Sequence, residues 1–117
     1  MVEVKIKMIN PQNGKKMCEL NFVADTGSIY SVVSVEELSK IGITPRYERE
    51  FKTIDGKKIR RKVGIAIFKY KEYEGGAPVI FGEKEDMNVL GVTALEAMGL
   101  EVDPVNKELK PVELLLL

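Results

Sequence analysis

Apolar and charged residues alternate strictly over residues 2–8, at the start of the chain. A period of two predicts a strand with one buried face. The run Asn-Pro-Gln-Asn-Gly follows at residues 10–14, and these residue types favour turns. Because an alternating pattern returns after the turn, we expect a hairpin whose second strand covers residues 17–24.

Most of the remaining chain has the pattern of short strands. We expect them at residues 29–33, 46–54, 57–70, 77–81, 88–91, 100–103 and 108–115. Two short helices are also predicted. The first covers residues 35–41, with Ser34 as its N-cap and Gly42 as its stop. The second covers residues 93–98 and ends at Gly99.

Glycines refine this picture at three places. Asp55-Gly56 is a strong signal for a hairpin turn between two strands. Gly64, inside a predicted strand, indicates a bend or a bulge. Residues 73–76 contain two glycines and are expected to form a loop. Many short strands with one or two short helices predict a mostly-β, barrel-like fold, in a single domain over residues 1–117.

The composition removes several classes of function. The 117 residues include 18 basic and 18 acidic ones, and a net charge of zero argues against nucleic acid as the main partner. The chain has no histidine, which excludes Ser-His-Asp catalysis and histidine-ligated metal sites. Cys18, the only cysteine, is expected to be a small apolar strand residue in a reducing compartment. We expect neither a signal peptide nor a membrane span, and hence a cytoplasmic protein without a membrane partner.

The candidate chemistry lies at Asp25-Thr26-Gly27-Ser28, directly after the apolar run 20–24. This pattern places one carboxylate on a tight turn at the end of a strand. Taken alone, the motif is explained by an Asx-type turn between two strands. Two further blocks of sequence favour a catalytic role for the carboxylate over a simple turn.

The three blocks are residues 22–28 with the following run 31–34, the hairpin 53–57, and Val89-Leu90-Gly91 before the predicted helix 93–98. In these blocks, and in their order, the chain resembles the retropepsin-like aspartic proteases, a family of single-domain homodimers. The resemblance spans most of the chain. It implies a mostly-β acid-protease fold, a closed barrel with one or two short helices.

The resemblance also implies a function. Asp25 would be the catalytic acid, and because each chain has one such motif, two chains would share a pair of carboxylates. Thr26, Gly27 and Ser28 would support the catalytic loop, with Thr26 bonding across the dimer. The implied activity is that of an aspartic endopeptidase, a hydrolase of peptide or protein substrates, which needs no metal and no cofactor.

The hairpin would form a flap over the substrate. The implied flap residues are Thr53, Ile54, Asp55, Gly56 and Lys57. The charged side chains at this tip depart from the family, whose flap tips are rich in glycine and apolar residues. Two alternatives therefore stay open: a non-catalytic dimeric peptide-binding module with the same fold, and a structural dimerisation domain in which Asp25 is only a turn residue.

The last four residues, 114–117, are all leucine. They could form a frayed end, a docked strand or part of a subunit interface. Docking is favoured because a free apolar end promotes aggregation.

Overall fold

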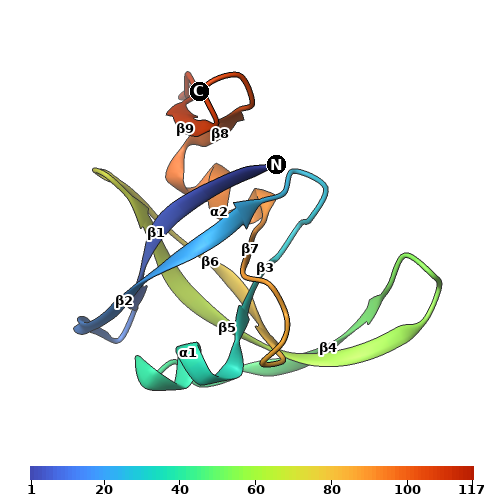
Figure 1. Cartoon of the computed structure of the whole chain (residues 1–117). Helices are drawn as coiled ribbons and strands as arrows, with labels where there is room; N and C mark the ends of the chain where they lie inside the picture. Colours follow the sequence, from blue (N-terminus) through green and yellow to red (C-terminus); the bar gives the residue numbers. More distant parts are fainter.

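The computed structural model describes residues 1–117 and contains nine strands and two helices (Figure 1). Their bounds are β1 Val2–Asn10, β2 Asn13–Ala24, β3 Ser31–Ser34, α1 Val35–Lys40, β4 Tyr47–Lys52, β5 Lys58–Tyr70, β6 Tyr73–Gly82, β7 Val89–Leu90, α2 Val92–Met98, β8 Leu100–Asp103 and β9 Glu108–Pro111. The prediction of a mostly-β structure with two short helices is confirmed.

Six strands close into a ring through their hydrogen bonds. Their order is β1-β2-β7-β3-β6-β5, and β5 pairs back onto β1, with Met8 opposite Phe68. Strand β4 pairs only with β5 and lies outside the ring. Strands β8 and β9 form a separate two-stranded sheet beyond α2 (Figure 1). The ring leaves β4 as an edge strand at the end of the large sheet.

A single cluster of 20 buried apolar residues fills the structure. Its largest fully buried side chains include Phe22 and Phe68, whose rings meet edge to face at 6.2 Å between centroids. On β1 the even positions are the most buried, as the alternation predicts. Burial of such apolar surface is the main force that holds a small domain together.

The predicted Ser34 cap and the two predicted glycine stops are confirmed, although α1 ends one residue earlier than predicted and α2 begins one residue earlier. The hydroxyl oxygen of Ser34 accepts a hydrogen bond from the Glu37 N–H at 3.4 Å, at the start of α1. Gly42 follows α1 with a φ of 76°, and Gly99 ends α2 with a φ of 73°. Only glycine adopts this left-handed conformation at little cost.

Residues 73–76 form the start of β6, so the predicted loop is wrong. A Cβ atom on Gly75 would lie 2.3 Å from the carbonyl oxygen of Ala97 in α2. Glycine is needed there because the helix packs directly on the strand, not because the chain turns. The predicted bulge at Gly64 is also absent, since the register continues unbroken and Gly64 pairs with Val79.

Strand β9 ends at Pro111, four residues before the predicted end. The Val112 N–H still donates to the Gly99 carbonyl oxygen at 3.0 Å in the same register, and pairing stops there because the next residue opposite, Met98, belongs to α2. The side chains of residues 114–117 are 73–116% exposed, so docking of the tail onto its own chain is wrong. A role of the tail at a subunit interface stays a prediction. Neither helix has the length and apolar character needed to cross a membrane.

Candidate active site

Asp25 lies in an exposed turn directly after β2. Its Oδ1 accepts a hydrogen bond from the Gly27 N–H at 2.8 Å, and its Oδ2 accepts one from the Ser28 hydroxyl at 3.0 Å. The Ser28 N–H also donates to the Asp25 carbonyl oxygen at 3.1 Å. These bonds fix the orientation of the carboxylate while leaving it open to solvent. We call residues 25–28 the Asp25 loop.

Gly27 and Thr26 have different places in this loop. A Cβ atom on Gly27 would lie 3.2 Å from Asp25 Oδ1, so a larger residue would crowd the carboxylate. The side chain of Thr26 is exposed and makes no hydrogen bond within the chain. Its predicted bond to a second chain therefore stays a prediction.

Strand β7, although distant in the sequence, fixes the position of the Asp25 loop. β7 lies between β2 and β3, parallel to the first and antiparallel to the second. The Asp25 N–H donates to the Leu90 carbonyl oxygen at 3.0 Å, directly beyond the paired residues. Two of the blocks named in the sequence, 22–28 and 89–91, thus lie side by side.

The start of α2 is capped by the segment that follows Asp25. The Val92 N–H donates to the Ser28 carbonyl oxygen at 2.7 Å, and the Thr93 N–H donates to that of Ile29 at 3.0 Å. The Thr93 hydroxyl donates to the same Ile29 oxygen at 2.8 Å. No side chain caps this helix, so backbone carbonyls next to the Asp25 loop satisfy N–H groups that the helix leaves free.

A buried serine, which the sequence did not single out, ties the same segments together. The hydroxyl oxygen of Ser31 accepts a hydrogen bond from the Gly91 N–H at 2.9 Å, and Ser31 is fully buried. A Cβ atom on Gly91 would lie 2.6 Å from the carbonyl carbon and oxygen of Tyr30. The signal in the sequence was a serine inside an apolar, β-branched run, where an unpaired hydroxyl would be costly.

The five predicted flap residues form a tight turn, 53–57, at the tip of a projecting hairpin (Figure 1). We call this hairpin, residues 47–63, the arm. The Thr53 N–H donates to the Lys57 carbonyl oxygen at 2.8 Å, and the Thr53 side chain bonds both the Asp55 carboxylate and the Lys57 N–H. Gly56 has a φ of 87°, and Ile54 is wholly exposed. The turn makes no hydrogen bond or ion pair with Asp25.

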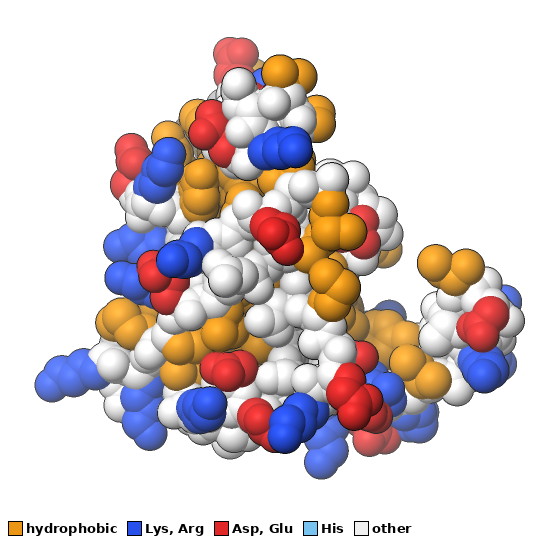
Figure 2. Space-filling view, viewed as in Figure 1, with side chains coloured by type: hydrophobic (Ala, Val, Ile, Leu, Met, Phe, Trp, Pro, Cys, Tyr) orange, Lys and Arg blue, Asp and Glu red, His pale blue; other side chains and the backbone are white.

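A hollow of about 600 Å³ lies between the Asp25 loop and the arm, and we call it the arm hollow. Its lining residues are Gly27, Ser28, Ile29, Tyr30, Val32, Arg49, Phe51, Lys52 and Ile80. The rings of Tyr30 and Phe51 meet edge to face at 5.7 Å and connect the body of the molecule to the arm. Figure 2 shows apolar side chains where the arm leaves the body. The residues that hold the Asp25 carboxylate therefore also line a space large enough for peptide side chains.

Two side chains outside the Asp25 loop, Tyr47 and Cys18, have raised pKa values. Partial desolvation and the nearby Tyr30 hydroxyl raise the pKa of Tyr47 on the arm. Burial and the nearby Glu37 carboxylate raise the pKa of the Cys18 thiol, which packs against the core from β2. A raised pKa lowers the fraction of reactive thiolate, so Cys18 behaves as the apolar strand residue that its pattern predicts.

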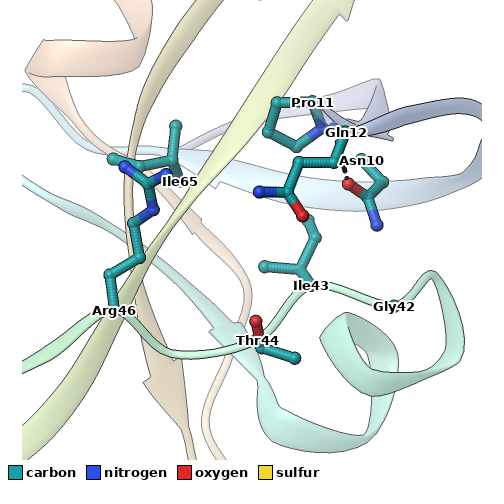
Figure 3. Close-up of a pocket in the computed structure, with 8 residues that line it drawn as sticks. All are labelled: Asn10, Pro11, Gln12, Gly42, Ile43, Thr44, Arg46 and Ile65. Atoms are coloured by element: carbon teal, nitrogen blue, oxygen red, sulfur yellow. Dashed lines mark hydrogen bonds between the residues drawn. The ribbon is translucent and has the colours of Figure 1, made fainter.

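A smaller hollow of about 110 Å³ lies between the β1–β2 turn, the segment after α1 and β5 (Figure 3). Asn10 organises its edge, because its side-chain amide donates to the Ile41 carbonyl oxygen at 2.9 Å and its Oδ1 accepts from the Gln12 N–H. Arg46 is the only charged residue in the lining, and no acidic side chain is present. This hollow has the character of a structural junction.

Comparison with family models and with curated proteins found no match to this chain.

Proposed function

We propose that this protein is an aspartic endopeptidase that acts as a homodimer, with one Asp25 from each chain. The observation that carries the proposal is the Asp25 carboxylate, which is exposed, held by Gly27 and Ser28, and adjacent to the arm hollow. One chain supplies a single such acid. A two-fold axis beside the Asp25 loop would bring a second copy to it.

The chemistry needs both carboxylates. Two carboxyl groups within hydrogen-bonding distance share one proton, because ionising both is costly. The ionised group takes a proton from a water molecule, and that water attacks the scissile carbonyl carbon. The protonated group donates its proton to the carbonyl oxygen. When the C–N bond breaks, the carboxyl group that holds the water's proton gives it to the leaving nitrogen, and the other carboxylate takes a proton back from a hydroxyl of the tetrahedral intermediate. No covalent intermediate with the enzyme forms.

Several features of the fold support this proposal. Gly27 and Ser28 already fix the orientation of the Asp25 carboxylate within each chain, so dimer formation would have to order it less. The arm provides a hairpin that could close over an extended substrate and exclude water from it. The six-stranded ring, with β7 inserted between β2 and β3, is compatible with the acid-protease fold that the sequence resembles. The unpaired Cys18 fits a reducing compartment, and we place the dimer in the cytoplasm.

The rival function is a dimeric module that binds extended peptides without cutting them. The observation in its favour is the charged tip of the arm, where the Asp55 carboxylate is taken up by Thr53 and where Lys57 follows directly. A tip organised around its own charges would have less freedom to fold onto a substrate backbone.

The test is cleavage of a diverse peptide library between about pH 3 and about pH 8 by the parent chain, Asp25→Asn and Glu85→Gln. The Glu85 variant is the matched control, since it makes the same acid-to-amide change in an exposed loop. We expect a bell-shaped pH profile in the parent and the control, and a loss of roughly 10²–10⁴-fold in Asp25→Asn. Binding of peptides without cleavage at any pH would favour the module instead.

A further inference from the structure

The arm hollow carries a charge pattern that the proposed chemistry does not use. Arg49 and Lys52 reach it from β4, and none of its nine lining residues is acidic. Both side chains are exposed, and neither makes an ion pair or a side-chain hydrogen bond. The neighbouring Arg60 and Arg61, by contrast, are paired with Glu48 at 2.8 Å and Glu83 at 3.4 Å. The two cations at the hollow are therefore free to bind an anion.

Apolar surface lies directly beside these cations. Tyr30 and Phe51 form one wall through their edge-to-face contact, and Ile29, Val32 and Ile80 contribute the rest. Ile29 is 69% exposed, so its apolar surface is available to a ligand. A ligand that fills the hollow must therefore combine an apolar group with a negative one.

The spacing on β4 indicates what kind of ligand this is. Arg49 and Phe51 are two residues apart in a strand, so their side chains share one face roughly 7 Å apart. β4 pairs only with β5, so its other edge has backbone groups without a partner strand. An extended peptide that pairs with such an edge places its own alternate side chains at the same spacing.

We infer that the arm hollow selects extended peptides with an acidic side chain and a large apolar side chain two residues apart. The acid would meet Arg49, and the apolar group would lie against Phe51 and Tyr30. A guanidinium binds a carboxylate through two parallel hydrogen bonds, which gives this contact direction as well as charge. The inference rests on the proposed function only for taking a peptide as the ligand.

The test measures binding separately from cleavage. Fluorescein-labelled peptides, identical except for Asp, Asn or Lys two residues before or after a leucine, are titrated with the full-length Asp25→Asn chain and followed by anisotropy at about 0.1 M salt. With the variable residue either before or after the leucine, in at least one of these two arrangements, we expect the Asp peptide to bind roughly tenfold or more tightly than the Asn peptide. The Lys peptide should bind more weakly still. Adding Arg49→Glu should remove this preference for Asp.

Lys15→Glu is the matched control, because it makes the same change of charge on an exposed residue of β2 far along the chain from the hollow. It should leave the preference unchanged. Equal affinity for the three peptides, a preference that Lys15→Glu removes equally, or no binding at all would overturn the inference. The proposed function is judged independently. Cleavage by the parent that depends on Asp25 but ignores peptide charge would support the endopeptidase alone, and an Arg49-dependent preference without cleavage would support the inference alone.

Discussion

Ser31 and Gly91, sixty residues apart in the sequence, are joined by a buried hydrogen bond of 2.9 Å from the Gly91 N–H to the Ser31 hydroxyl oxygen. The bond connects β3 to the junction of β7 and α2, and the same junction holds the Asp25 loop through Leu90. The position of the candidate catalytic residue therefore depends on a contact between the two halves of the chain.

Replacing Ser31 by Ala should destabilise the protein by about 1–3 kcal/mol, because the buried Gly91 N–H loses its partner. Urea unfolding followed by circular dichroism measures this change. Ser39→Ala is the matched control, since Ser39 lies on the exposed side of α1, and its effect should stay within about 0.5 kcal/mol. Equal effects of the two substitutions would show that the Ser31 bond contributes little.

Replacing Gly91 by Ala should be more damaging, at about 3 kcal/mol or more. The added Cβ would lie 2.6 Å from backbone atoms of Tyr30, and backbone cannot move aside as a flexible side chain can. Gly14→Ala, where nothing lies within 4 Å of the added atom, is the control. If Gly91→Ala unfolds at the same urea concentration as Gly14→Ala, the close approach of Gly91 to the Tyr30 backbone is wrong.

Asp103 should make part of the stability depend on pH. The Asn106 side-chain amide, followed by the Asn106 backbone N–H, lowers the pKa of Asp103 below its ordinary value of 3.8. The folded state therefore favours the carboxylate, so its contribution is complete above pH 3.8 and is lost as the pH falls through the folded-state pKa. The difference in the free energy of unfolding between the parent and Asp103→Asn should be larger near pH 7 and should decrease in acid.

Urea midpoints at several pH values measure this difference. Glu108→Gln, an exposed acid on β9, serves as the control and should show no comparable decrease. If the difference in stability between the parent and Asp103→Asn stays constant across the acid range, the role given to Asn106 is contradicted.

Local signals predicted the local features of the fold. The β1–β2 alternation, the Ser34 cap, the turn at Asp55-Gly56 and the stop at Gly99 each follow from residues close together in the sequence. The helices, most strands and the arm were therefore predictable. The turn geometry at Asp25 was predictable for the same reason, because its partners are two and three residues away.

Contacts between distant segments explain what the sequence could not show. Gly75 resembles a loop residue in its own neighbourhood, but its structural reason is Ala97 in α2. The end of β9 follows from the position of α2, because Met98, the residue opposite Glu113 in the register, is helical, and no local pattern around β9 reveals this. Likewise, Arg49 is one of many charged strand residues until the fold places it beside Phe51 at the arm hollow.

The central claim is that two chains share one pair of Asp25 carboxylates, and mixing the parent with Asp25→Asn tests it most directly. The parent is held at a concentration where sedimentation shows it to be fully dimeric, and its cleavage rate is measured as the variant is added. A shared pair predicts that an equal amount of variant, after exchange of chains, reduces the rate to about half, because mixed dimers have only one acid. A rate that stays unchanged while the chains exchange, or a parent that is active as a monomer, would contradict the claim.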